Sequence, residues 1–246
     1  MYDPKGNGKE RSIDRVRFVE ARPPKHLSGI IHRYLEIYTE NSLAEEYQFH
    51  ALPDACTYLI FDQLNIDVAG VTRLKASSEE LSLGKSFHFV NVRFLPGVWQ
   101  HDLIPVSYGL VKDPYQGDLP LQGLNNELKG LQFSDQQNLL SEFVEELLKR
   151  KLVKENIVTQ KIFEQLEDIH SVADMAEVAE LSARQLQRVL KASTGFAPHD
   201  FLKVLRLQQS LLGEPSLSYA DQSHFIHSFK KATGYTPARY SKKFDV

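Results

Sequence analysis

Cysteine is nearly absent from this chain of 246 residues, since Cys56 is the only one. A single cysteine excludes an internal disulfide framework and is typical of a reducing compartment. No apolar run approaches the roughly 20 residues that a membrane-spanning helix needs, and the opening MYDPKGNGKERS has no apolar signal core. A glycine-rich phosphate loop is also missing, and the sequence indicates no cofactor. We therefore expect a soluble cytoplasmic protein with no membrane partner.

The net charge of -3 hides an uneven distribution. From Ser182 to Val246, ten Lys and Arg residues stand against four Asp and Glu residues, so this end carries +6 and the remaining residues carry -9. A basic end on an acidic body favours a polyanionic partner for that end. An ordinary solvated charged surface is the alternative explanation, because it also produces such differences.

The length favours two domains, and the apolar pattern changes along the chain. Residues 1–22 are polar without a sustained period, which predicts a flexible or loosely docked arm. Residues 23–133 carry short aromatic and β-branched runs such as FHFVNVRFL, where apolar and polar residues alternate as in a half-buried strand. This region is predicted to be mainly β, with a loop-rich stretch punctuated by prolines at 105, 114 and 120.

Capping residues mark the helices expected after this β region. Ser134, followed three residues on by Gln137, forms a capping box for a helix over 135–152. Residues 134–156 are thus predicted to be a helical segment and linker, and residues 157–246 a helical domain. Its helices are predicted over 157–169, over 172–179 with Ser171 as N-cap, from Ser182 to Gly195, and from Pro198 to about Leu212. The expected fold class is α+β.

One phrase occurs twice in the helical region. Leu186 to Phe201 reads LQRVLKASTGFAPHDF, and 39 positions later Phe225 to Tyr240 reads FIHSFKKATGYTPARY. Lysine, threonine, glycine and proline recur at equivalent positions, and apolar residues stay in register. The repetition predicts two related helical units.

Arg184, Gln187, Arg188 and Lys191 lie opposite the apolar stripe of the first repeated helix. Two helices joined by a short turn, with the second presenting such residues, are what a helix-turn-helix reader of DNA requires. Arginine pairs with guanine and glutamine with adenine at their major-groove edges, and Lys191 suits a phosphate. The alternative is that these residues are merely the solvated face of an amphipathic helix.

Residues 171–246 resemble the DNA-binding domain of the AraC/XylS family of transcription regulators. The motifs that carry the resemblance are LSARQLQRVLKASTGFAPHDFLKVLRLQQ (Leu181 to Gln209) and YADQSHFIHSFKKATGYTPARY (Tyr219 to Tyr240). The resemblance implies two helix-turn-helix units joined by a long helix, each unit placing one helix in the major groove of double-stranded DNA. It assigns base reading in the second unit to Gln222, Ser223, His224 and His227. We expect Lys230, like Lys191, to contact a phosphate.

The upstream region looks like the sensor-like domain that precedes this module in some family members, through HALPDACTYLIF (His50 to Phe61) and VRFLPGVW (Val92 to Trp99). The resemblance implies a sequence-specific regulator gated at this domain by a small-molecule effector or a partner, and it leaves room for a homodimer. An alternative function is a ligand- or protein-binding module with a degenerate DNA reader.

The second unit departs from the family pattern. Its scaffold helix would fall on Leu211 to Ser218, but Gly213 and Pro215 disfavour a helix by about 1 and 3 kcal/mol. Asp221 is the expected N-cap of the following helix. His227 stands where the family commonly has arginine, which predicts a weak or pH-dependent contact.

Other chemistries have weaker support. His50, Asp54 and Cys56 lie close in sequence, as in a thiol nucleophile with its base, but such proximity is common by chance. His88, His101 and Asp102 have no recognised metal-ligand spacing. We therefore expect neither an enzyme nor a metal site. Trp99 suits either a small-molecule pocket or core packing.

Overall fold

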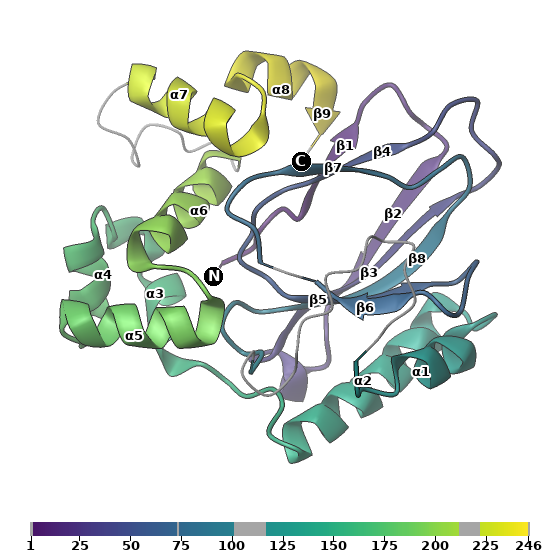
Figure 1. Ribbon diagram of the computed structural model, residues 1–246, viewed down its shortest axis with the longest axis horizontal. Coiled ribbons are helices and arrows are strands. Elements are labelled where there is room, and N and C mark those ends of the chain that lie inside the picture. Colours follow the sequence, from purple (N-terminus) through teal and green to yellow (C-terminus); the bar gives the residue numbers. More distant parts are fainter. Residues whose placement is uncertain (1, 73, 101–116, 212–221, 246) are drawn as a thin grey trace.

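The computed structural model describes residues 2–72, 74–100, 117–211 and 222–245. Eight of the strands lie in the first hundred residues and the α-helices follow them, so the predicted α+β class is confirmed (Figure 1). The helices α3 to α8 lie on one side of the sheets, and α1 and α2 lie against another side (Figure 1).

The strands form two antiparallel sheets. The five-stranded sheet has the order β2-β3-β8-β5-β6, and the four-stranded sheet has the order β7-β4-β1-β9. The first comprises β2 (Val16–Ala21), β3 (Ile31–Thr39), β5 (Tyr58–Asp62), β6 (Ala69–Val71) and β8 (His88–Phe94). The second comprises β1 (Asn7–Glu10), β4 (Gln48–Ala51), β7 (Glu79–Ser82) and β9 (Phe244–Asp245).

The helices follow in two groups. The first group is α1 (Leu121–Leu128) and α2 (Phe133–Lys149). The second is α3 (Ile157–Glu164), α4 (Val172–Val178), α5 (Ala183–Thr194), α6 (Pro198–Leu211), α7 (Gln222–Thr233) and α8 (Pro237–Lys243). Short 3-10 turns occur at Lys25–Leu27 and Leu166–Asp168. Among the described residues, no helix is both long and apolar enough to cross a membrane.

The largest core lies between the five-stranded sheet and the pair α1 and α2. Buried sheet residues such as Tyr34 and Phe94 pack with Leu128 and Leu140 of these helices. Helix α1 was not predicted, because the prolines before it indicated only a loop. Pro120 in fact precedes the first turn, where a missing backbone N–H costs nothing. Residues 101–116 of the predicted loop lie outside the described residues.

The predicted capping box at Ser134 is wrong. Helix α2 begins at Phe133, with Gln132 as N-cap and no side-chain capping hydrogen bond. Phe133 packs against the large core, so tertiary contact draws this residue into the helix and leaves Ser134 in its first turn. The helix predicted over 157–169 is also shorter, because Gln165 leaves the helical conformation after α3.

The interpretation of residues 1–22 as a flexible or loosely docked arm is wrong as well. They contain β1 and β2, which pair with neighbours in both sheets. The Tyr2 side chain is buried and stacks on Phe163 of α3, with ring centroids 4.5 Å apart. The polar composition of this segment gave no indication of these contacts. They could not be predicted locally, because the partners of these residues lie far away in sequence.

We predict that Tyr2→Ala lowers the free energy of unfolding by about 3 kcal/mol, since it removes a buried aromatic ring from the helical core. Urea unfolding followed by circular dichroism measures this change. Val19→Ala is the control, because Val19 is exposed on β2 and its replacement is expected to cost about 0.5 kcal/mol or less. Equal, small effects of both substitutions would show that the arm does not contribute to stability.

Candidate nucleic-acid interface

The first helical unit consists of α4 and α5 joined by a tight turn. The Ser171 Oγ accepts a hydrogen bond from the Asp174 backbone N–H, which begins α4. Ser182 and Gln185 form a capping box at the start of α5, and Gly195 ends that helix in the left-handed region with φ 71°. The predicted N-caps Ser171 and Ser182 and the C-terminal glycine are therefore confirmed.

The turn between α4 and α5 holds Glu180 at φ 54°, a left-handed conformation that is uncommon for residues other than glycine. The Leu181 N–H donates to the Ala176 carbonyl at 2.9 Å, and the Lys161 ammonium lies 2.9 Å from the Glu180 carboxylate. These contacts fix the turn, so α4 sets the orientation of α5.

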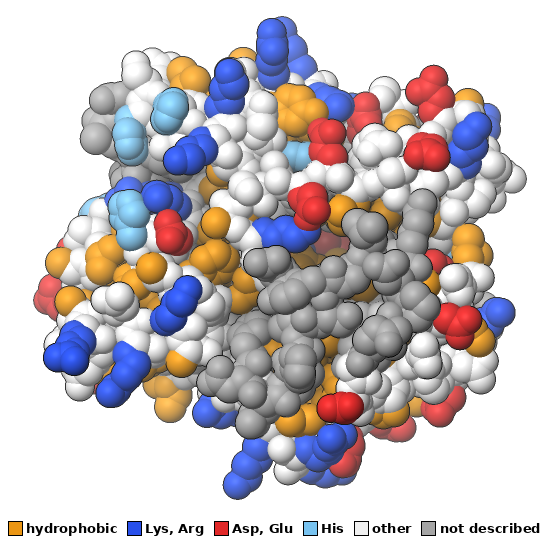
Figure 2. Space-filling view, viewed as in Figure 1, with side chains coloured by type: hydrophobic (Ala, Val, Ile, Leu, Met, Phe, Trp, Pro, Cys, Tyr) orange, Lys and Arg blue, Asp and Glu red, His pale blue; other side chains and the backbone are white. Residues whose placement is uncertain are grey.

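Helix α5 has one buried and one exposed face. Leu186 and Leu190 are completely buried in the helical core. Arg184, Gln187 and Arg188 are exposed on the other side. Basic side chains are visible over the position of α5 in Figure 2. The structure thus brings the three predicted base-reading residues together on one helix face.

Lys191 is also exposed, but its ammonium donates to the Gly195 carbonyl at 2.8 Å. This bond places the charge at the C-terminus of α5, where it is favourable. Lysine has three N–H donors, so two remain for a phosphate oxygen.

The second unit reproduces the turn chemistry of the first 39 positions later. Thr194 Oγ1 donates to the Leu190 carbonyl at 2.7 Å and accepts from the Phe196 N–H at 3.2 Å. Thr233 Oγ1 likewise donates to the Phe229 carbonyl at 2.9 Å and accepts from the Tyr235 N–H at 3.2 Å. Gly234 adopts φ 80°, like Gly195. The repeated sequence therefore encodes a repeated helix end.

The predicted residues of the second unit lie on α7. Gln222, Ser223, His224, His227 and Lys230 are all exposed, while Phe229 and Thr233 are buried. Residues 212–221 lie outside the described residues, and with them all of the expected scaffold segment except Leu211, the last residue of α6, and the expected N-cap Asp221.

A cavity of about 140 Å³ lies between the two sheets. Its lining is mainly apolar, with side chains such as Phe18, Ile37 and Leu81. Asp54, Tyr58 and Arg93 supply polar groups to it. An apolar cavity of about 150 Å³ is large enough for a ligand of benzene size.

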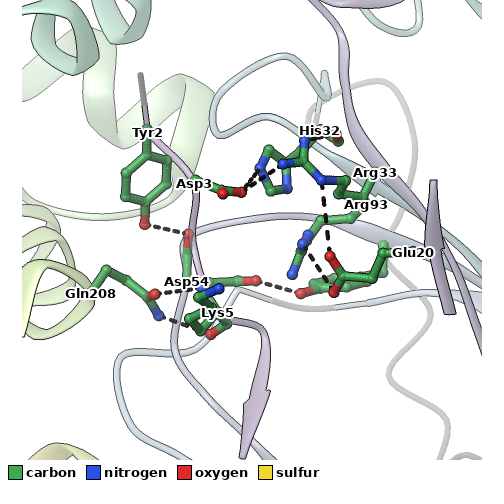
Figure 3. A network of polar contacts seen from close by, with 10 residues as sticks. Tyr2, Asp3, Lys5, Glu20, His32, Arg33, Asp54, Arg93 and Gln208 are labelled. Atoms are coloured by element: carbon green, nitrogen blue, oxygen red, sulfur yellow. Dashed lines mark hydrogen bonds and ion pairs between the residues drawn. The ribbon is translucent and has the colours of Figure 1, made fainter. Parts of the chain in front are cut away.

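The polar wall of this cavity continues into a buried network (Figure 3). Tyr58 Oη donates to the Asp54 carboxylate. The Arg93 guanidinium Nη2 lies 3.7 Å from the Glu20 carboxylate Oε1. Burial raises the pKa of Asp54, although the Arg93 guanidinium opposes the shift. Arg93 Nε is buried without a hydrogen-bond partner in the described part of the chain.

The N-terminal residues connect the same network to the helices. Tyr2 Oη donates to the Asp54 carbonyl at 2.9 Å. Gln208 of α6 accepts from the Lys5 N–H at 2.7 Å, and its amide donates to the Lys5 and Pro53 carbonyls at 3.1 and 2.8 Å. The cavity wall is therefore in hydrogen-bond contact with the helix that joins the two units (Figure 3).

His32 and Asp3 form a second part of this network, with His32 Nε2 2.8 Å from the Asp3 carboxylate (Figure 3). Burial lowers the pKa of His32 to about 4. The hydrogen bond from His32 holds the pKa of Asp3 well below its ordinary value. At neutral pH a neutral imidazole thus donates to a carboxylate.

The residues considered for a thiol nucleophile, a metal site or a ligand pocket have structural contacts that explain them. Burial raises the pKa of the Cys56 thiol well above its ordinary value, opposite to what a thiolate nucleophile needs. His50 Nε2 lies 3.1 Å from the Thr233 carbonyl, and His88 Nε2 lies 2.9 Å from the Glu36 carboxylate. Trp99 packs in the large core. His101 and Asp102 lie outside the described residues, among which no cluster of potential metal ligands occurs.

The geometry of α4 and α5 is that of a helix-turn-helix unit. No family profile matches the chain. The HTH-type transcriptional regulator MtrA of Neisseria gonorrhoeae is 30% identical over 95 aligned residues, which cover 34% of this chain and 32% of that protein. The chain thus spans about a third of the length of this relative. The match is a similarity to an HTH-type transcriptional regulator over the aligned residues.

The chain is also similar to two solved structures of ToxT from Vibrio cholerae, one of them an apo variant. Both are 13% identical to this chain and cover 94% of it, with TM-scores of 0.43 and 0.42. This chain covers 97% and 98% of them. These scores indicate only distant similarity.

We predict that Ser182→Ala costs about 1 kcal/mol of stability, because it removes the hydrogen bond that Ser182 Oγ accepts from the Gln185 N–H and the one that Oγ donates to Gln185 Oε1. Thermal or urea unfolding measures the change. Ser134→Ala is the matched control and is expected to change stability by about 0.5 kcal/mol or less, since Ser134 caps no helix. Equal losses in both variants would contradict the assigned caps.

Proposed function

We propose that this protein is a sequence-specific DNA-binding transcription regulator that reads the major groove mainly through α5. The observation that carries the proposal is the exposed face of α5, where Arg184, Gln187 and Arg188 lie together. The opposite face of α5 packs in one core with α4. Arginine and glutamine are the side chains that make bidentate contacts with guanine and adenine. The similarity to MtrA supports the same function.

Phosphate contacts would come from the basic residues around this face. Lys191 lies in the last turn of α5, and Lys230 occupies the equivalent exposed position on α7. The positive charge of the C-terminal residues supports binding to a polyanion. Base reading by α7 would use Gln222, Ser223, His224 and His227, which are shorter or less basic than the residues of α5 and would contribute less to specificity.

The cavity between the sheets supports gating by a small, mainly apolar effector with one polar group. Such a ligand would contact the wall formed by Asp54, Tyr58 and Arg93, which reaches Gln208 of α6 through the Pro53 carbonyl. A ligand changes DNA binding only if it binds two states of the protein with different affinity. A second copy of the chain remains a further candidate partner.

The second candidate function is a ligand- or protein-binding module with a degenerate DNA reader. It is favoured by Gly213 and Pro215 in the expected scaffold segment of the second unit and by the acidic remainder of the chain. The same DNA-binding measurement separates the two functions.

The test is a salt titration of fluorescence anisotropy with genomic fragments and a random duplex of equal length. The wild type is expected to bind its specific fragments at least 1000-fold more tightly than the random duplex. Arg184→Ala with Arg188→Ala should abolish that preference, because it removes both guanine-reading side chains.

The matched control is Lys149→Ala with Arg150→Ala, which removes the same charge from exposed positions at the end of α2. This variant should keep the preference for specific fragments. Wild-type binding that never exceeds binding to the random duplex would reject the regulator and favour the second candidate function.

A further inference from the structure

The C-terminal end of α7 is capped by residues of the β region. The Ser78 N–H donates to the Ala232 carbonyl at 2.7 Å. His50 on β4 lies with Nε2 3.1 Å from the Thr233 carbonyl. The last carbonyls of a helix lack partners within the helix. Two of those in α7 are therefore satisfied by a different part of the fold.

The buried face of α7 also depends on the four-stranded sheet. Phe229, Tyr240 and Phe244 form a small core that is completed by Leu52, just after β4, and by Leu207 of α6. Beyond α8, β9 pairs with β1 in that sheet. The Tyr235 hydroxyl donates to Glu80 on β7 at 2.7 Å. The sheet thus contacts each part of the unit formed by α7, α8 and β9.

The two helical units are consequently supported in different ways. In the first unit α5 packs on α4 within the helical core. In the second, Gly213 and Pro215 disfavour a helix where the repeat would place the equivalent of α4. A reading helix must be held at a fixed angle to enter a groove. The contacts with the sheet supply that support for α7.

His50 occupies the centre of this contact. Its ring stacks on Phe244 at 4.7 Å and lies 5.6 Å from the ring of Tyr240. Only 1% of the residue is exposed, and Nδ1 has no partner in the described part of the chain. A second proton on the ring would therefore be buried without an acceptor, which is costly.

We propose that the four-stranded sheet is the scaffold of the second reading unit and that His50 is a positioning residue that caps α7. This inference rests on the proposed DNA-binding function. It goes beyond that function because it assigns the orientation of α7 to contacts with the β region as well as to contacts within the helical region. A change in the β region would then alter the second half of the DNA contact directly.

The capping contact has a defined pH dependence. Burial lowers the pKa of His50, although the Thr233 carbonyl opposes the shift. The titratable groups that face the ring are Glu80 on β7, Lys243 and Tyr240 on α8, and Tyr235 before that helix, while β1 presents only Gly8. A depressed histidine pKa means that docking is fully stable above about pH 6.5 and weakens as the pH falls below it.

Limited trypsin digestion of the full chain tests the docking without DNA. The exposed sites at Lys230, Lys231, Arg239 and Lys242 report on the second unit, and those at Arg184 and Arg188 report on the first. His50→Leu is expected to speed cleavage in the second unit about tenfold and to leave cleavage in α5 unchanged. His50→Gln, which keeps a donor near the Nε2 position, should restore much of the protection.

Gly8→Ala provides a second variant, because a Cβ at Gly8 would clash with the Tyr240 hydroxyl of α8 and would lie 3.0 Å from Phe244 Cγ of β9. We expect the clash to weaken the contact of α8 and β9 with β1. The variant should speed the same cleavages without altering His50. His88→Leu is the matched control, since this histidine contacts Glu36 within the five-stranded sheet. It should leave both groups of sites unchanged.

A hydroxyl-radical footprint on a bound fragment then tests positioning. His50→Leu and Gly8→Ala should lose protection of the half-site read by α7 while keeping that of α5, and the wild type should lose the α7 half as the pH falls from 7.5 to 5.5. Unchanged digestion in both variants, or equal acceleration at the α5 sites, would overturn the proposal. Specific binding that is absent from the wild type would instead reject the proposed function, while digestion would still decide the docking.

Discussion

The pairing of β1 is the interaction on which the arrangement of the whole chain depends. This strand of four residues lies between β4 of the β region and β9 at the end of the helical region. An unpaired edge strand exposes a row of backbone donors and acceptors, so β1 satisfies both of its edges only when the two regions meet. The pairing of Lys9 and Glu10 with Asp245 and Phe244, more than 230 positions apart, thus connects the two regions.

The same N-terminal residues carry polar contacts from the cavity to the helices. Tyr2, Lys5 and Asp54 converge near Gln208, whose amide uses both its donor and its acceptor in this contact. Buried polar groups are costly to separate from their partners. A change at the cavity wall can therefore reach α6 through these hydrogen bonds, and α6 lies between the two helical units in the chain.

Local features of the helical region were predictable from sequence because their causes are local. Ser182 caps α5, Gly195 ends it, and the Thr-Gly-aromatic turn recurs 39 residues later. The exposed face of α5 followed from helical periodicity alone. Its role in reading DNA was inferred from side-chain chemistry and from resemblance, and it stays a prediction.

Features that depend on distant contacts were missed. The burial of Tyr2 against Phe163 and the use of β1 as a strand have no local signal, because the sequence there is polar and the partners lie far along the chain. At Ser134 a local signal was misleading. The sequence there fits a capping box, but Phe133 packs against the large core and the helix begins at that residue. The neighbours of His50 in sequence gave no indication of its partner, which is the distant Thr233 carbonyl.

Native-state hydrogen exchange at increasing urea concentration tests most directly whether the two regions form one cooperative body. Amides of β1 and β4 should open with the same free energy as those of α6 and α7, and these values should fall together as urea is added. Opening of α6 and α7 at a clearly lower free energy, with β1 and β4 still protected, would contradict the coupling.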